Sequence, residues 1–187
     1  GGVGMDNIDV DYAREKGLHV INTPAASSAS VAELVFAHLY GGVRFLYDAN
    51  RQMPLEGDSN FKVLKKNYAG GSELRGKTMG VIGFGRIGQE TAKIALGVGM
   101  HVIAHDPFMD KAEVKVVLGN GAAVDVAIEM NSFESVLKEA DFISLHVPAQ
   151  DKPVIGKKEL GMMKKGAGLI NAARGGVIDE EALLDAL

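Results

Sequence analysis

The chain has 187 residues, 47% of them hydrophobic, a formal net charge of −4 and no cysteine. This length and composition allow one α/β domain with a sizeable core. The acidic balance provides no basic surface for nucleic acid or for an anionic membrane. No apolar run is long enough to span a bilayer. The absence of cysteine excludes disulfides, thiolate metal sites and a cysteine nucleophile, and it fits a reducing, cytoplasmic location.

Both ends of the sequence suggest a segment of a longer protein. The chain opens on Gly1-Gly2-Val3-Gly4 without an initiator methionine. It closes on a helical pattern, Glu180 to Leu187, that has no glycine stop or polar cap. We therefore expect residues 1–187 to form one domain, with further functional groups outside it.

The N-terminal part combines short elements with one long helix. Residues 1–7 are glycine-rich and predict a loop or crossover. The predicted short elements are a helix over Asp9–Lys16 that stops at Gly17, and a strand over Leu18–Ile21.

Ser30 to Glu33 form a capping-box pattern, and apolar residues at helical spacing follow. They predict one helix from Val31 to about Asn50. Phe36 and Tyr40 lie off its main apolar stripe, so the helix is either fully buried or packed against both its own domain and a second subunit. Gln52–Gly76, with scattered charge, Gly and Pro, predicts a linker or surface loop.

The stretch from Thr78 to Asp106 is the most informative part of the sequence. Met79–Ile82 predicts a buried strand, and Gly83-Phe84-Gly85-Arg86-Ile87-Gly88 follows it directly. A helical pattern then leads to a second apolar strand over Met100–Ala104 and to Asp106. The order is strand, glycine turn, helix, strand and acid, which is typical of a dinucleotide-binding unit.

Each residue of this unit has a physical use. Gly83 permits a tight turn, Gly85 lets a pyrophosphate approach the backbone, and Gly88 lets the helix pack close to the strand. The helix N-terminus offers free N–H groups to phosphates. Asp106 can accept hydrogen bonds from ribose hydroxyls and would repel a 2′-phosphate, which favours NAD over NADP. The alternative is a purely structural glycine turn with an ordinary strand-end Asp106.

The rest of the chain alternates between the two kinds of element. Predicted helices lie at Asp110–Leu118, Asn131–Lys138, Lys157–Met163 and after a capping Asp179. Predicted strands lie at Phe142–His146, Gly168–Ile170 and, as a short strand, within Ala122–Met130. This alternation predicts an α/β fold with a doubly wound, mostly parallel sheet. Asp106, Val147-Pro148 and Arg174 all follow strand ends and should share one edge of that sheet.

A second motif points to a family. Asn171-Ala172-Ala173-Arg174-Gly175-Gly176-Val177-Ile178-Asp179, together with the glycine turn and Leu145-His146-Val147-Pro148, resembles the NAD-dependent D-2-hydroxyacid dehydrogenases. The resemblance extends from Gly4-Met5-Asp6-Asn7-Ile8-Asp9 to the end of the chain. Ser72–Thr78 is most similar to the 3-phosphoglycerate dehydrogenase branch, although glyoxylate and hydroxypyruvate reductases share the pattern.

This resemblance implies a Rossmann-type NAD-binding domain over residues 1–187, with the substrate-binding domain and a C-terminal catalytic segment outside the chain. It also implies roles for individual residues. The pyrophosphate would be held by Gly83, Gly85, Arg86, Ile87 and Gly88. The adenosine ribose would bind Asp106, and the adenine would lie against Val147 and Pro148. The nicotinamide end would lie near Val3 and the backbone of Ala172 and Ala173, beside the catalytic Arg174.

An arginine suits that position chemically. A guanidinium can bind the planar carboxylate of a 2-keto acid through paired hydrogen bonds and polarise its carbonyl for hydride attack. The alternative for Arg174 is a surface arginine that bonds nearby carbonyls. The proton donor of the family is a His oriented by a Glu, and both would lie beyond the end of this sequence. His146 is interpreted as a structural or cofactor-adjacent residue, and not as that His.

The resemblance predicts oxidation of a D-2-hydroxy acid to the 2-keto acid, with 3-phosphoglycerate as the expected substrate and a homodimer or homotetramer as the expected assembly. Glyoxylate or hydroxypyruvate reduction is the alternative within the family. An NAD-regulated corepressor-like interaction protein is the alternative outside enzymology, and an S-adenosylhomocysteine hydrolase-type domain is disfavoured by the Asn171–Asp179 segment. No ligand spacing for a metal site is visible, and hydride transfer of this kind requires none.

Overall fold

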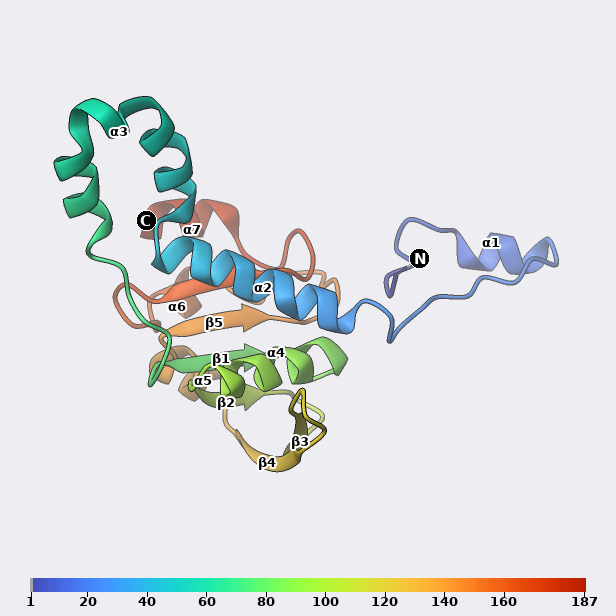
Figure 1. Ribbon diagram of the computed structural model, residues 1–187. Coiled ribbons are helices and arrows are strands. Elements are labelled where there is room, and N and C mark those ends of the chain that lie inside the picture. Colours follow the sequence, from blue (N-terminus) through green and yellow to red (C-terminus); the bar gives the residue numbers. More distant parts are fainter. Residues whose placement is uncertain (1) are drawn as a thin grey trace.

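The computed structural model describes residues 2–187 and has a six-stranded sheet with helices on both faces (Figure 1). The spatial order is β3-β4-β2-β1-β5-β6. The strands are β1 (Thr78–Ile82), β2 (His101–His105), β3 (Ala112–Val117), β4 (Ala123–Met130), β5 (Phe142–Leu145) and β6 (Gly168–Asn171). All neighbouring strands pair in parallel except β3 and β4. The predicted doubly wound, mostly parallel sheet is therefore confirmed.

The helices form a layer on each face of the sheet. Helices α2 and α4 contact each other and cover one face, whereas α5 and α6 lie on the other with α7 beside α6 (Figure 1). The helices are α1 (Val10–Glu15), α2 (Ser28–Val43), α3 (Leu46–Tyr68), α4 (Arg86–Gly97), α5 (Phe133–Glu139), α6 (Lys157–Leu160) and α7 (Glu180–Ala186). Among residues 2–187, no helix combines the length and the apolar character needed to cross a bilayer.

Strand β1 divides the core into two layers because successive side chains of a strand point to opposite faces. Met79 and Val81 pack into the layer under α2 and α4, and Ile82 packs into the layer under α5. Gly80 faces α5 as well, and a Cβ there would lie 2.8 Å from Val136 Cγ1. The absence of a side chain at this position lets α5 approach the sheet closely.

The predicted strand–turn–helix–strand unit is confirmed as β1, α4 and β2. In the parallel pair of β1 and β2, Thr78 lies opposite His101 and Ile82 opposite His105. On its other side β1 pairs in parallel with β5. Strands before β5 are added on one side of β1 and strands from β5 onward on the other, so the strand order reverses between β1 and β5. In such sheets the crevice at that switch point, beyond the carboxyl ends of the strands, is where ligands bind.

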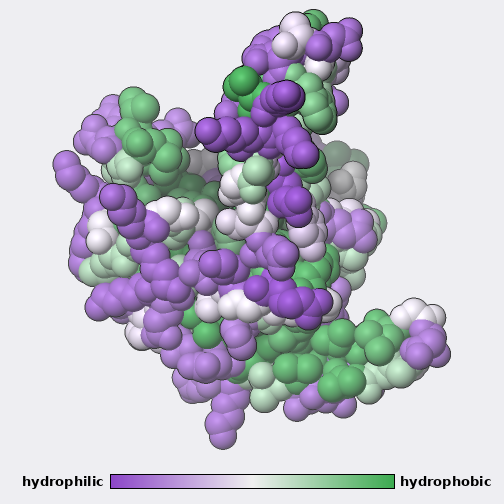
Figure 2. Space-filling model, turned by 60° about the vertical axis from the view of Figure 1, so that its left-hand side comes forward, coloured by the Kyte–Doolittle hydropathy of each residue, from purple (hydrophilic) through white to green (hydrophobic). Residues whose placement is uncertain are grey.

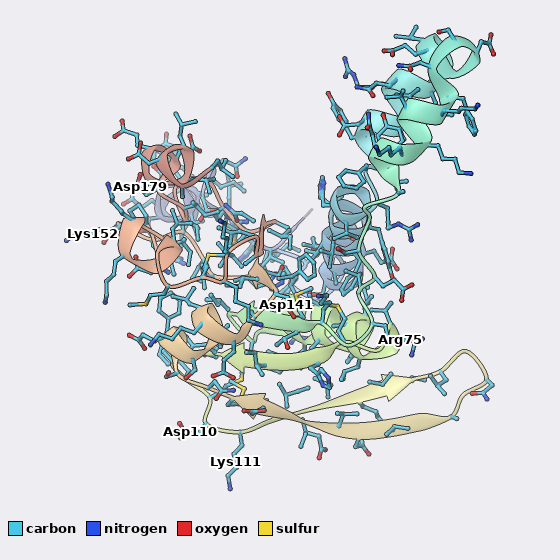
Figure 3. All side chains as sticks on the ribbon, turned by 90° about the vertical axis from the view of Figure 1, so that its left-hand side faces the viewer. Arg75, Asp110, Lys111, Asp141, Lys152 and Asp179 are labelled. Carbon is cyan, nitrogen blue, oxygen red and sulfur yellow. The ribbon has the colours of Figure 1, made fainter. Side chains whose placement is uncertain are left out.

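The helix predicted over Asp110–Leu118 is wrong. The segment forms β3, which pairs antiparallel with β4 in a hairpin beyond Asp110 and Lys111 (Figure 3). The turn closes through hydrogen bonds from the Leu118 amide to the Ala122 carbonyl (2.7 Å) and from the Gly121 amide back to the Leu118 carbonyl (2.8 Å). Val114 and its same-face neighbours alternate with charged residues, and this period of two buries one face of the hairpin.

The single helix predicted to Asn50 is also wrong, because Phe45 adopts a left-handed conformation (φ 55°) and separates α2 from α3. Helix α2 starts at Ser28, before the expected capping box, and its N-cap residue Ser27 makes no side-chain hydrogen bond. Helix α3 replaces the predicted loop up to Tyr68, whereas residues 69–76 have no helix or strand, as predicted; the helix includes Pro54 and a kink at Asn60. It forms a largely hydrophilic projection from the domain (Figure 2).

The remaining elements follow the predictions in part. Helix α1 is present and ends before Gly17, and Asp179 caps α7 through the Ala182 amide. The cap of helix α5 is Ser132, one residue after the expected Asn131, and α6 is shorter than predicted. The strand predicted over Leu18–Ile21 is wrong: the segment has no strand partner, and Ile21 is 87% exposed.

Candidate active site

The glycine turn is built so that side chains are excluded from two positions. Gly83 has φ +90°, and its amide donates to the His105 carbonyl at 2.9 Å. A Cβ on Gly83 would lie 2.6 Å from the His146 carbonyl oxygen. A Cβ on Gly88 would collide with the Gly83 carbonyl oxygen. These contacts draw α4 against the ends of β1 and β5.

Gly85 has a different role, because the space around it is open. It is the N-cap residue of α4, and no side chain caps the helix. A Cβ at Gly85 would meet nothing within 4 Å. The first turn of α4 thus presents N–H groups and the positive end of the helix dipole to an accessible space, which fits the pyrophosphate of a dinucleotide.

Asp106 follows β2 and supports the glycine turn from the side. One carboxylate oxygen accepts the Phe84 amide at 2.8 Å, and the other accepts the Phe108 amide at 2.9 Å. The side chain is half-buried. Each carboxylate oxygen has a second lone pair, so Asp106 keeps the capacity to accept hydrogen bonds from ribose hydroxyls.

A cavity of about 360 Å³ lies beyond the carboxyl ends of β1, β5 and β6. It is lined by Val3, Pro24, Gly85, Arg86, Ile87, His146, Val147, Pro148, Ala172, Ala173 and Arg174. The structure therefore brings together residues that lie far apart in the sequence. Gly83, Gly88 and Asp106 do not line this cavity; the two glycines shape the turn beside it, and Asp106 holds the Phe84 amide.

Arg174 lies in the loop after β6. Its Nε donates to Asp6 Oδ2 at 3.0 Å, and its Nη1 donates to the Ala173 carbonyl at 2.9 Å. The side chain of Asn171 braces this loop, since its Nδ2 donates to the Arg174 carbonyl and its Oδ1 accepts the Ala173 amide. Arg174 is 40% exposed, so part of its guanidinium remains accessible from the cavity.

His146 is held in a network of hydroxyl groups behind the cavity wall. Its Nε2 lies 2.9 Å from Ser144 Oγ and 3.2 Å from Thr91 Oγ1, and Thr91 also donates to the Ile87 carbonyl. Its Nδ1 is buried without a hydrogen-bond partner. Burial lowers the pKa of His146 to about 4, because it penalises the charged imidazolium. His146 is therefore neutral near pH 7 and acts as part of the wall.

Sequence reasoning did not single out Asp6 or Asn171. Asn171 carries a local signal, because Asn side chains often bond their own backbone two residues on in turns. Asp6 carries no such signal, since it lies 168 residues before Arg174. Among residues 2–187, no cluster of three or more His, Cys, Asp or Glu side chains is arranged to hold a metal ion.

The D-isomer specific 2-hydroxyacid dehydrogenase NAD binding domain matches residues 36–187 of this chain. The chain belongs to this family. The matched range contains the glycine turn, Asp106 and Arg174. All residues that line the cavity, except Val3 and Pro24, lie within it. NAD is the cofactor of this domain.

Individual relatives agree with this assignment. The domain is 44% identical over 186 residues to hydroxypyruvate reductase of Thermotoga maritima, covering 98% of this chain and 55% of that protein. It is 45% identical over 188 residues to D-3-phosphoglycerate dehydrogenase of Methanocaldococcus jannaschii, covering 100% of this chain and 33% of that protein. The chain thus spans about half or less of these relatives.

A solved structure gives the same result. The crystal structure of D-lactate dehydrogenase with NAD⁺ from Lactobacillus jensenii superposes with a TM-score of 0.74 at 34% identity. The superposition covers 100% of this chain and 52% of that protein. The predicted Rossmann-type domain and the predicted family are therefore confirmed.

Proposed function

We propose that this chain is the cofactor domain of a longer enzyme that interconverts a D-2-hydroxy acid and its 2-keto acid with NAD. The observation that carries the proposal is the cavity that joins the N-terminus of α4 to Arg174. One end of this cavity suits a dinucleotide phosphate, and the other presents a guanidinium to an anionic substrate.

The site residues receive the following roles in this proposal. The turn of Gly83, Gly85, Arg86, Ile87 and Gly88 holds the pyrophosphate, with Gly83 and Gly88 giving the turn its shape and Gly85, Arg86 and Ile87 facing the cavity. Asp106 binds the ribose, Val147 and Pro148 the adenine side, and Ala172 and Ala173 the nicotinamide side. Arg174 binds the substrate carboxylate and polarises the carbonyl, so that negative charge on its oxygen is stabilised during hydride transfer. NADH held by these residues would supply a hydride for the carbonyl carbon, and the carbonyl oxygen would need a proton from a general acid. The neutral, hydrogen-bonded His146 is not that acid.

We propose 3-phosphoglycerate as the hydroxy acid, oxidised to 3-phosphohydroxypyruvate in serine biosynthesis. The Methanocaldococcus relative supports this choice, and the Thermotoga relative supports hydroxypyruvate reduction as the second candidate. We also propose a homodimer or homotetramer in the cytoplasm. Exposed apolar side chains on α2 and α3 support the assembly, among them Leu34, Tyr40, Leu46, Tyr47 and Leu55. The fully buried alternative for α2 does not hold within this chain.

The substrate is tested with the purified full-length enzyme. Initial rates are measured with NADH and with NADPH on 3-phosphohydroxypyruvate, hydroxypyruvate, glyoxylate and pyruvate. We expect NADH to be preferred and one of the first two acids to give the highest kcat/KM. Arg174→Ala should lower kcat/KM by about 100-fold or more, because it removes a charge-stabilising donor. The matched control is Arg14→Ala, which removes an exposed arginine paired with Asp11.

Cofactor binding is tested by titration calorimetry of the same protein with NAD and NADP. Asp106→Ala should weaken NAD binding by about 10-fold, since charge-assisted hydrogen bonds to the ribose are lost. Asp110→Ala removes an exposed carboxylate at the start of the hairpin and should leave binding unchanged. Equal affinity of the wild-type protein for both cofactors would contradict the role given to Asp106.

A further inference from the structure

The N-terminal segment before α2 reaches the reacting end of the cavity. Val3 and Pro24 line the cavity, and the Thr23 amide donates to the Gly2 carbonyl at 2.9 Å. The Asn22 side chain donates to the Val3 carbonyl, also at 2.9 Å. These bonds hold the two ends of the segment together beside the loop after β6. Most residues from 2 to 24 are exposed, and the segment meets the rest of the domain mainly at this cavity.

That contact is made through Arg174. Asp6 accepts a hydrogen bond from Nε at 3.0 Å, and the Ala173 carbonyl accepts one from Nη1 at 2.9 Å. A guanidinium has five N–H donors, of which these two bonds use one on Nε and one on Nη1. The second N–H of Nη1 and both N–H groups of Nη2 remain. Asp6 therefore occupies one corner of the guanidinium and leaves a pair of nitrogens that can bind a carboxylate.

Gly4 completes the arrangement. A Cβ at Gly4 would collide with Arg174 Nη2, and it would lie 2.9 Å from Asp6 Oδ2. Because Gly4 has no side chain, Arg174 Nη2 can lie where a Cβ of residue 4 would be, and Arg174 Nε can reach Asp6. Gly4 does not have a positive φ, so this contact, and not backbone conformation, is what requires a glycine.

We infer that Asp6 and Gly4 form a positioning element that fixes the orientation of the Arg174 guanidinium for the substrate carboxylate. The inference deepens the proposed function and depends on it, because it assumes that Arg174 binds the substrate. Asp6 is a positioning residue and does not touch the substrate. Its carboxylate limits the rotation of a long, flexible side chain, and such preorganisation strengthens binding without adding a contact to the ligand.

The ion pair contributes little to folding, which makes the inference testable. Asp6 is 66% exposed and Arg174 40% exposed, and exposed pairs of this kind have small effects on stability. Asp6→Asn should therefore leave the melting temperature unchanged. Gly4→Ala should also fold, because the atom that it would displace is the far end of a flexible side chain.

The experiment is a double-mutant cycle in the full-length enzyme, with saturating NADH and the preferred 2-keto acid. Asp6→Asn and Gly4→Ala should each lower kcat/KM by about 10-fold, mainly through KM, because the guanidinium is misplaced. Asp6→Glu keeps the charge and should restore part of the loss. In an Arg174→Ala background, Asp6→Asn should have no further effect. Asp11→Asn is the matched control, because Asp11 pairs with Arg14 on the same segment.

A binding measurement accompanies the kinetics. The affinity of the NADH complex for oxalate, an unreactive planar dicarboxylate, should fall with Asp6→Asn, while the affinity for NADH stays the same. An Asp6→Asn effect that persists in the Arg174→Ala background would overturn the inference, as would wild-type kinetics of Asp6→Asn beside an impaired Arg174→Ala. Full activity of Arg174→Ala would instead overturn the proposed function itself.

Discussion

His146 should make the domain sensitive to acid, and replacing it should remove that sensitivity. The perturbation is His146→Gln, which cannot become charged and whose Nε2 can take the place of the imidazole Nε2 between Ser144 and Thr91. Burial lowers the pKa of His146 from 6.5 to about 4. The unfolded chain therefore binds a proton at this residue at a higher pH than the folded chain does.

The magnitude follows from this difference in pKa. Each tenfold difference in proton affinity corresponds to about 1.4 kcal/mol, so the contribution of His146 to the free energy of unfolding is about 3 kcal/mol. This stability is fully present above pH 6.5, is lost progressively as the pH falls toward about 4, and does not return below it. The wild-type protein should thus lose more stability than the variant between pH 7 and pH 4.

The assay is urea unfolding of the 187-residue chain at several pH values, in the wild type and in His146→Gln. The difference in unfolding free energy between them should change with pH in the stated direction. His101→Gln, at the exposed start of β2, is measured beside it as a second histidine variant. NMR of ¹³C-labelled histidine gives the pKa directly. A His146 resonance that titrates near 6.5, or a pH-independent difference for His146→Gln, would refute the reasoning.

Three further predictions concern the fold around the site. Gly88→Ala should lower the stability by about 2 kcal/mol through overpacking and abolish NAD binding in calorimetry, whereas Gly97→Ala on the same helix has room for its Cβ and should do neither. Val114→Ala should lower the unfolding free energy by about 2 kcal/mol, because this residue is 2% exposed in the hairpin; no loss in urea titration would contradict the hairpin packing. Ser132→Ala should cost about 1 kcal/mol of stability, measured against Ser27→Ala, which removes no capping bond.

The parts of the fold that depend on local pattern could be predicted from the sequence. The β1–α4–β2 unit follows from an apolar run, a glycine turn and a helical apolar face, and each of these is read within a few residues. The hairpin could also have been predicted, because Asn120-Gly121 between two alternating stretches is a recognised hairpin signal. The same Gly119-Asn120-Gly121 stretch also fits the stop of a helix over Asp110–Leu118, which is the prediction made above, and the alternation from Ala112 to Val117 decides against it.

Other elements depend on contacts that no local pattern contains. Helix α3 contains Pro54 and Gly57, and Leu64 is its only buried residue among those described. It therefore has little apolar periodicity to detect. The site shows the same division. The glycine turn and Arg174 follow from motifs, whereas the contact of Arg174 with Asp6 joins the two ends of the sequence and is visible only in three dimensions.

The position of the strands in the sheet has a consequence for hydrogen exchange. Strand β1, which leads into the glycine turn, has a hydrogen-bonded neighbour on each side, whereas β6, which leads to Arg174, is the last strand of the order within residues 2–187. Amides of central strands exchange only through large openings, and those of edge strands exchange through small local ones. In the 187-residue chain studied by itself, the backbone that shapes the cofactor end should therefore exchange more slowly than β6 and the loop that carries Arg174. Within this chain, the two halves of the cavity would then differ in mobility, with the nucleotide half more rigid than the half that carries Arg174.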